Sequence, residues 1–212
     1  MAARDFVTAW NRLDRELVRR ALSVRSPRVS ELPRRAAVAL VLTEAPLGVE
    51  VLLIRRATRA GDPWSGQMAL PGGHHAEADG ALLETALREA AEEVGVDLRQ
   101  SGELLGQLDD VLPGNAAVAV SPFVFAVESR PVLTPRSEEV DAVVWASLGA
   151  LARGESRIEH ELRMERQVLR FPAFQLGEHV VWGMTYRVLL ALIERVRETL
   201  RLDSLEAGDS RG

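Results

Sequence analysis

The sequence predicts an α/β protein, an α/β/α sandwich in which a mixed β-sheet lies between layers of helix. Two kinds of segment support this prediction. Apolar runs rich in β-branched residues recur along the chain and are typical of buried strands. Segments with apolar residues at helical spacing lie before, between and after those runs. Because the two kinds of segment alternate, helices are expected on both faces of the sheet.

The expected elements can be placed in order along the chain. A helix is expected over residues 6–22 and a linker over 26–33. Two strands over 36–43 and 49–54 are joined by a turn, and a loop over 61–66 then leads to a pair of glycines and a further helix. The remaining elements are strands at 104–111, 118–127 and 140–146, a short helix at 147–153, a hairpin of 168–171 with 179–182, and an amphipathic helix at 184–200.

The length and composition predict one main domain. The chain has 212 residues, of which 47% are hydrophobic, and this is enough for one substantial core. The expected division is an N-terminal helix and linker over residues 1–30, the main domain over 31–202, and a polar, disordered tail over 203–212.

Charge and composition argue against several classes of function. A net charge of −5 and a pI near 5.5 disfavour a nucleic-acid surface, because phosphate backbones require clustered Lys and Arg. The chain has no cysteine, which suits a reducing compartment. Apolar runs fall short of the ~20 residues that span a bilayer, and the N-terminus lacks a signal-peptide core. We therefore expect a cytoplasmic protein that binds neither nucleic acid nor membrane.

The most informative stretch is a Pro-Gly-Gly turn at 71–73, followed by a glutamate-rich helix that ends near Gly95. At about 100° per residue, one face of this helix is apolar and the adjoining flank carries Glu89, Glu92 and Glu93. Such like charges repel one another by about 0.2–0.5 kcal/mol per pair unless a cation neutralises them. Asp79 is a candidate N-cap and Gly95 a C-terminal stop.

The chemistry of these carboxylates indicates which metal they suit. Ligands that offer only oxygen, with no cysteine in the chain and no histidine on the helix, favour Mg²⁺ or Mn²⁺ over Zn²⁺. The alternative is an ordinary solvated face, which is what most glutamate-rich helix faces are. The glycine turn in front of the helix favours the metal site.

The glycine turn and the glutamate-rich helix resemble the signature of a known protein family. Residues 73–96 resemble the Nudix box, whose second half, Arg-Glu-aliphatic-x-Glu-Glu-x-Gly-aliphatic, matches from Arg88 onward if Ala90 takes the aliphatic position. The first half departs from the consensus, because His74 and Gly80 stand where the box has its glycine and its glutamate. The loop is therefore one residue longer than the consensus.

A longer loop of this kind is similar to the coenzyme A pyrophosphatase-like branch of the family. Thr-Ala-Leu-Arg-Glu-Ala at 85–90, Gly-Gln-Met-Ala-Leu-Pro-Gly-Gly at 66–73 and Trp-Gly-Met-Thr-Tyr-Arg at 182–187 all resemble segments of that branch. The upstream part of its signature is only half present, since Ala57 and Trp64 replace a serine and a histidine.

The resemblance implies a set of site residues. Glu89, Glu92 and Glu93 would be metal ligands, the carbonyl of Gly73 a fourth, and one glutamate the general base, with Arg88 completing the catalytic set. The sequence leaves open which glutamate is the base. It also leaves open the partner of Arg88, since either Glu84 or Asp79 stands in for the absent box glutamate.

Further residues are candidates for contact with the substrate. Arg55, Arg56 and Arg59 leave the second strand and could clamp phosphates, although a solvated rim is an equal alternative. Gly72 and Gly73 are further candidates for contact with the substrate. Glu139 is a candidate extra metal ligand or base, the alternative being a solvated strand entrance.

These residues and the resemblance together predict a function. The chain is expected to be a Mg²⁺- or Mn²⁺-dependent hydrolase that cleaves the diphosphate bond of a small nucleotide, with coenzyme A or an acyl-coenzyme A as the first choice. The alternatives are nucleoside diphosphate sugars, ADP-ribose, nucleoside triphosphates, or a non-catalytic nucleotide-binding module. A homodimer is the oligomeric state we keep open.

Overall fold

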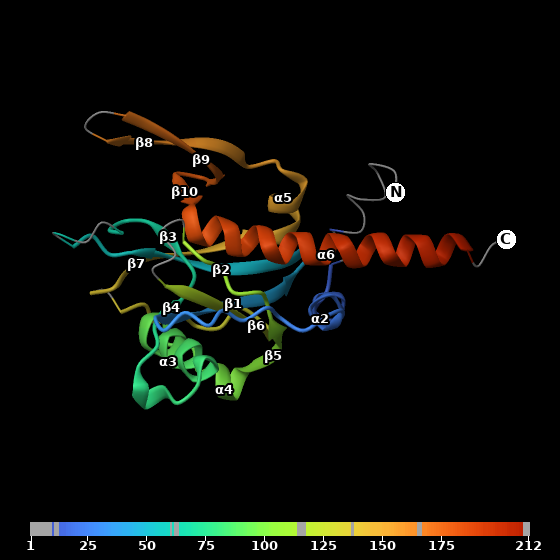
Figure 1. Ribbon diagram of the computed structural model, residues 1–212, viewed down its shortest axis with the longest axis horizontal. Coiled ribbons are helices and arrows are strands. Elements are labelled where there is room, and N and C mark those ends of the chain that lie inside the picture. Colours follow the sequence, from blue (N-terminus) through green and yellow to red (C-terminus); the bar gives the residue numbers. More distant parts are fainter. Residues whose placement is uncertain are drawn as a thin grey trace.

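The computed structural model describes residues 10, 13–59, 61, 64–113, 118–136, 138–164 and 167–209. A large central sheet lies between two layers of helix, and a small second sheet adjoins it on the side of helix α6 (Figure 1). This arrangement confirms the predicted α/β/α sandwich with a mixed sheet.

The central sheet has seven strands, in the order β3-β2-β1-β6-β5, with β4 paired to β1 and β7 paired to β2. The pairs β1–β2, β1–β4 and β5–β6 are antiparallel, whereas β1 and β6 run parallel, so the sheet is mixed. The strands are β1 (Arg35–Ala45), β2 (Gly48–Arg56), β3 (Met68–Ala69), β4 (Gly72–His74), β5 (Gly102–Gln107), β6 (Ala119–Val127) and β7 (Val140–Ser147).

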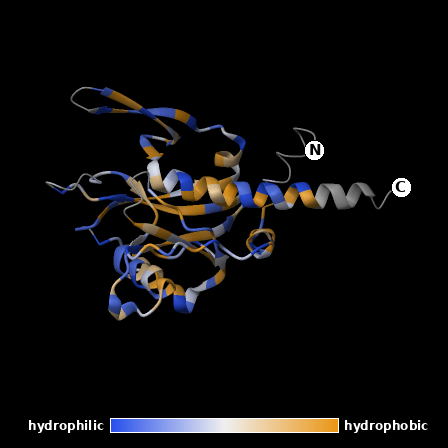
Figure 2. Ribbon diagram, in the orientation of Figure 1, coloured by the Kyte–Doolittle hydropathy of each residue, from blue (hydrophilic) through white to orange (hydrophobic). Residues whose placement is uncertain are grey.

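Each face of the sheet has its own apolar core. One core joins the sheet to α3 (Leu82–Val94) and α4 (Leu98–Ser101), and the other joins it to α2 (Arg15–Ser23), α5 (Leu148–Arg153) and α6 (Gly183–Asp209). The central strands are accordingly mostly hydrophobic, and the helices are mixed (Figure 2). Alternate residues of β2 enter opposite cores, Leu53 on the α6 side and Ile54 on the α3 side, as the strand pleat requires.

The second sheet contains a strand that the sequence analysis missed. Its order is β10-β9-β8, with β8 at Arg157–Met164, β9 at Gln167–Leu176 and β10 at His179–Trp182. The expected segments 168–171 and 179–182 are both strands, but the expected pairing between them is wrong. Residues 179–182 of β10 pair with 173–176 of β9, whereas 168–171 pair with β8. β8 carries many charged residues, but its apolar and aromatic residues alternate with them at the two-residue period of a strand.

The starts of two helices, α2 and α3, differ from expectation. α2 begins only at Arg15, because the Asp14 side chain accepts a hydrogen bond from Leu17 N at 2.8 Å; residues 6–9, 11 and 12 of the expected helix lie outside the described residues. A 3₁₀ turn, η1 (Glu77–Asp79), precedes α3, so Ala81 and not Asp79 is the N-cap. The stop at Gly95 is confirmed.

The last helix is longer than the predicted 184–200. α6 runs to Asp209, since neither proline nor glycine interrupts the chain until residue 208. The expected domain boundary after residue 202 therefore falls inside a helix, and residues 210–212 of the expected tail lie outside the described residues. Within the described part of the chain, no helix combines the length and the apolar character that a bilayer crossing requires.

Candidate active site

The glycine turn and α3 meet on one face of the central sheet. β4 pairs with the start of β1, and Ala39 N donates to the carbonyl of Pro71 at 2.8 Å. A Cβ on Gly72 would lie 2.4 Å from the Ala37 carbonyl oxygen. A Cβ on Gly73 would lie 2.3 Å from a carboxylate oxygen of Glu89. Both glycines are therefore required by close contacts, the first with the sheet and the second with the helix.

Glu93 is the most buried carboxylate of the site, with 5% of its surface exposed. Its Oε2 accepts a hydrogen bond from the backbone N–H of Gly72 at 2.9 Å, which ties the glycine turn to α3. Burial raises the pKa of Glu93 to about 7, although this hydrogen bond and the charge of Arg56 act in the opposite direction. The positive charge near the Glu93 carboxylate is therefore not enough to offset the effect of burial.

Glu89 lies one turn earlier on α3 and is also largely buried. Burial raises its pKa, and the adjacent Arg88 opposes this shift. The charge of Glu92 raises the pKa of Glu89, the charge of Glu89 raises the pKa of Glu93, and the charge of Glu139 raises both pKa values. Glu92 is more exposed and is held by Arg88. A hard cation between these groups would relieve the repulsion.

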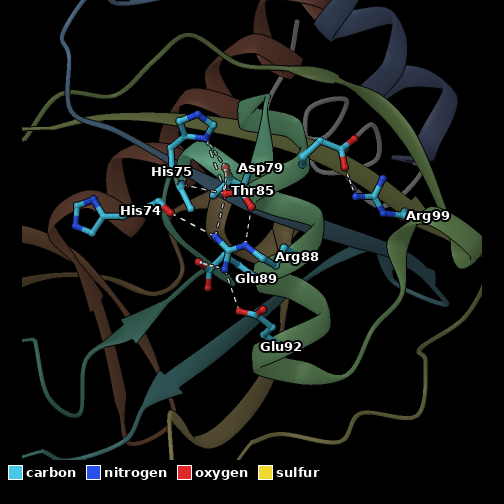
Figure 3. Close-up of polar contacts among 10 residues, drawn as sticks. His74, His75, Asp79, Thr85, Arg88, Glu89, Glu92 and Arg99 are labelled. Carbon is cyan, nitrogen blue, oxygen red and sulfur yellow. Dashed lines mark hydrogen bonds and ion pairs between the residues drawn. The ribbon is translucent and has the colours of Figure 1, made fainter.

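Arg88 organises the polar side of the helix (Figure 3). Its Nε and Nη2 donate to the two oxygens of Asp79 at 2.8 and 3.1 Å, in a bidentate pair. Its Nη1 donates to Glu89 at 2.8 Å and to Glu92 at 2.9 Å. The guanidinium thus bridges the 3₁₀ turn to two of the candidate ligands, which makes Arg88 a positioning residue.

The structure decides between the two expected partners of Arg88. Asp79 is the partner, and Arg88 lowers the pKa of its carboxyl far below the usual range. Asp79 Oδ2 also accepts from Thr85 Oγ1 at 2.8 Å, and Thr85 in turn contacts the His75 ring at 2.8 Å. Glu84 instead forms an ion pair with Arg99. Sequence analysis missed Thr85, whose signal is its position at the apolar edge of α3, where a hydroxyl requires a partner.

Asp79→Asn is expected to lower turnover of the diphosphate substrate by about 10- to 100-fold, as for other residues that orient metal ligands. Asparagine keeps the shape but loses the charge that holds the Arg88 guanidinium in the position from which it contacts Glu89 and Glu92. The measurement is the rate at which the phosphate-monoester products form as a function of Mg²⁺ concentration. The half-saturating Mg²⁺ concentration should rise, whereas a purely structural role would leave it unchanged. Glu84→Gln is the matched control, and a larger effect from it than from Asp79→Asn would contradict this assignment.

The segment before β7 brings Glu139 to the same region. Arg136 N donates to the carbonyl of Glu93 at 3.0 Å, and Ala57 N donates to the carbonyl of Glu139 at 2.8 Å. The segment is therefore held to the end of α3 and to the end of β2. The Glu139 carboxylate is 3.7 Å from Arg59 and close enough to Glu89 and Glu93 to affect both pKa values.

Arg55 and Arg56 face different parts of the molecule. The charge of Arg56 reaches Glu93, so this side chain is on the α3 face with the carboxylates. Arg55 lines a pocket on the other side, beside β3 and the small sheet. Neighbouring residues of a strand point to opposite faces, so Arg55 does not lie beside Arg56 at the carboxylates, and phosphate binding by either arginine stays a prediction.

The donor set fits a hard divalent cation. In the described part of the chain, Glu93 offers a buried oxygen without an ion-pair partner at contact distance, and Glu89 offers a largely buried carboxylate that Arg88 only partly compensates. The other groups nearby are Glu92, Glu139 and backbone carbonyls of the glycine turn. Among the described residues, no three Asp, Glu or His side chains already converge closely enough to hold an ion. Binding of a cation would therefore require the glutamates to draw together.

The raised pKa of Glu93 predicts how stability depends on pH when metal is absent. Folded Glu93 keeps its proton up to about pH 7, whereas the unfolded residue loses it near pH 4.5. The free energy of unfolding should fall as pH rises between these values, by roughly 3 kcal/mol from this group. Denaturant unfolding in EDTA should show this slope for the wild type and for Glu84→Gln, and a clearly smaller slope for Glu93→Gln. Equal slopes in all three would contradict the burial of an unpaired carboxylate.

Comparison with known proteins identifies related chains. The family model for the NUDIX domain matches residues 33–167. An uncharacterised protein of Schizosaccharomyces pombe is 34% identical over 181 residues, covering 72% of this chain and 54% of that protein. Nudix hydrolase 22, chloroplastic, of Arabidopsis thaliana is 32% identical over 165 residues, covering 74% and 54%. The mitochondrial coenzyme A diphosphatase NUDT8 of Homo sapiens is 32% identical over 170 residues, covering 79% and 71%. The chain thus spans about half the length of the first two relatives.

Proposed function

We propose, because this chain belongs to the Nudix domain family, that it is a hydrolase that cleaves the phosphoanhydride bond of a nucleoside diphosphate derivative with the help of a divalent cation. Coenzyme A or an acyl-coenzyme A is the substrate that we propose. The observation that carries the proposal is the buried Glu93 beside Glu89 at the glycine turn, where carboxylates outnumber the cations that could neutralise them.

The metal ligands in this proposal are Glu89, Glu92 and Glu93, with the carbonyl of Gly73 as a further ligand. Mg²⁺ or Mn²⁺ held there would supply positive charge to the diphosphate and acidify the attacking water. Thr85 donates a hydrogen bond to Asp79, and Asp79 holds Arg88. Arg88 in turn holds Glu89 and Glu92 in place. One of the carboxylates, with Glu139 as a candidate, accepts the proton from water.

Positive charge near the site supports binding of a diphosphate. Arg56 lies on the α3 face within electrostatic reach of Glu93. Its guanidinium can bind phosphate oxygens in a bidentate manner. Neither Gly72 nor Gly73 has a side chain that would cover its backbone, which allows a substrate to approach the main chain closely.

Two observations support coenzyme A as the substrate. One relative is named a mitochondrial coenzyme A diphosphatase. The segments 66–73 and 182–187, which resemble the corresponding branch, lie in contact, because Thr185 Oγ1 donates to the carbonyl of Met68 at 3.2 Å. A cytoplasmic location and a homodimer remain predictions, and the names of the relatives include a mitochondrial and a chloroplastic protein.

A panel of nucleotides tests the proposal. Hydrolysis would be measured by chromatographic separation of the nucleotide products of coenzyme A, acetyl-coenzyme A, ADP-ribose, a dinucleoside polyphosphate and a nucleoside triphosphate, each with Mg²⁺, Mn²⁺ or EDTA. Metal-dependent turnover of coenzyme A or its thioester is the expected result. Turnover of another diphosphate would reject the substrate and keep the reaction. Nucleotide binding without turnover would favour the non-catalytic module.

A further inference from the structure

A pocket of about 390 Å³ lies outside the carboxylate site, between the central sheet and the small sheet. Arg55 at the end of β2 and Gln67 and Met68 beside β3 form one wall. His160, His179 and Trp182 of the small sheet are on the other wall. Its volume is within the range of small-molecule sites, and it combines apolar walls with a few polar groups, as such sites do.

The register of the small sheet explains which residues line the pocket. His160 pairs with Phe171, and Trp182 pairs with Ala173, two residues further along β9. These residues therefore share one face of the sheet. The Trp182 ring packs against His160 at 5.1 Å and against Phe171 at 5.3 Å between ring centroids. This aromatic face is held against β3 by the hydrogen bond from Thr185 to Met68.

Arg55 gives the pocket a cation with unused hydrogen-bond donors. Within the described part of the chain, the Arg55 guanidinium makes no hydrogen bond, and its one ion pair is a 3.7 Å contact with Asp141. Its Nε is shielded from solvent and has no acceptor. A buried N–H without a partner is destabilising, so binding of a ligand that supplies an acceptor there is favoured.

The other polar groups of the pocket also favour an acceptor-rich ligand. The ring nitrogens of His160 and His179 make no hydrogen bond to any described residue, and the nearest charge to His179 is Glu178 at 3.8 Å. Glu178 is 82% exposed and so is largely solvated. Two imidazoles and a guanidinium around one pocket, in a chain of net charge −5, match an anion that carries several oxygens.

We propose that this pocket binds a phosphate monoester carried by the nucleoside of the substrate, separate from the diphosphate that is cleaved. The inference rests on the proposed function and narrows its substrate class to nucleotides with such an additional phosphate. Met68 of the pocket precedes Gly72 of the carboxylate site by four residues, which is about 13 Å of extended chain at most. One nucleotide with its phosphates can bridge that span. Arg56 and Arg55 then contact different phosphates, because they are on opposite faces of the sheet.

Calorimetric binding of 3′,5′-ADP and 5′-AMP to the full chain without metal tests this pocket. The wild type should bind 3′,5′-ADP about tenfold or more tightly than 5′-AMP, as a charge-assisted hydrogen-bonded group does. Arg55→Gln should bring the ratio of the two affinities close to one. Arg163→Gln changes the same residue type on an exposed part of β8 and should keep the wild-type ratio. His179→Gln is a second test if Arg55→Gln fails to fold, and it should also reduce the ratio.

Several results would overturn the proposal. One is equal affinity of the wild type for the two nucleotides, or no measurable binding of either. Another is an unchanged ratio in Arg55→Gln and His179→Gln. A further result is competition by inorganic phosphate. If inorganic phosphate displaces 3′,5′-ADP in the presence of 5′-AMP, and binds by itself with the same affinity as 3′,5′-ADP, the pocket is a site for free phosphate and the substrate assignment is wrong. The affinity ratio could also change in the variants as expected while the protein hydrolyses neither coenzyme A nor dephospho-coenzyme A. That result would reject the proposed function and support the phosphate-binding pocket.

Discussion

Glu93→Gln is expected to lower kcat for the diphosphate substrate by about 10³-fold, within the range for removal of an essential acid–base group. Glu93 is buried and is held by the Gly72 N–H, and a glutamine oxygen can accept the same hydrogen bond. The protein should therefore stay folded while the site loses one negative charge toward the cation. Steady-state kinetics at saturating Mg²⁺, with the unfolding temperature as a check, measure both effects.

The matched control for this variant is Glu84→Gln. Glu84 is on the same helix, but it pairs with Arg99 and is outside the carboxylate cluster. Its substitution should change kcat by less than about twofold, since surface ion pairs contribute little. If Glu93→Gln retained wild-type turnover, Glu93 would be neither ligand nor base, and the site would have to be built around Glu89, Glu92 and Glu139 instead.

Alanine substitution of the two adjacent glycines is expected to affect different properties, the activity in Gly73→Ala and the stability in Gly72→Ala. In Gly73→Ala the new Cβ would lie 2.3 Å from a Glu89 oxygen, at the end of a flexible side chain that can move. Activity should fall by about 100-fold, since a displaced ligand is costly, while stability changes little. In Gly72→Ala the Cβ would lie 2.4 Å from the Ala37 carbonyl and 2.7 Å from the Val38 Cα. The backbone of β1 cannot move aside, so a loss of stability of about 3 kcal/mol or more is expected.

The comparison requires the stability and the activity of both variants. Unfolding in denaturant gives the stability, and the rate of product formation by the folded fraction gives the activity. A second observation would separate the causes in Gly73→Ala: Glu89→Ala in the same chain removes the clash and should restore any lost stability without restoring activity. If Gly73→Ala were fully active, Glu89 would have no role at its present position and the close contact would be incidental.

Much of the fold could be predicted from periodicity alone. The apolar stripe of α3, its glutamate flank and the left-handed stop at Gly95 all follow from helical spacing and from the conformational preference of glycine. The strands β1 and β6 are mostly apolar along their length, because the centre of the sheet is covered on both faces. Such signals are local, and each is strong enough to identify its element.

The failures share a physical cause, which is that tertiary contacts decide them. Asp79 has the sequence position of an N-cap, but its carboxylate accepts from Arg88 and Thr85, because the 3₁₀ turn carries it alongside α3. β8 is polar enough to read as a loop and is a strand only because β9 pairs along its whole length. The separation of Arg55 from Arg56 depends on which layers cover the two faces at the end of β2.

The most direct test of the central claim is the identity of the products formed from coenzyme A with Mg²⁺, determined by mass spectrometry in H₂¹⁸O. Cleavage of the phosphoanhydride should give 3′,5′-ADP and 4′-phosphopantetheine, with one ¹⁸O in only one of the two products. The reaction should disappear in EDTA and in Glu93→Gln. Release of inorganic phosphate with dephospho-coenzyme A as the product, or an intact substrate under all metal conditions, would contradict the proposed reaction.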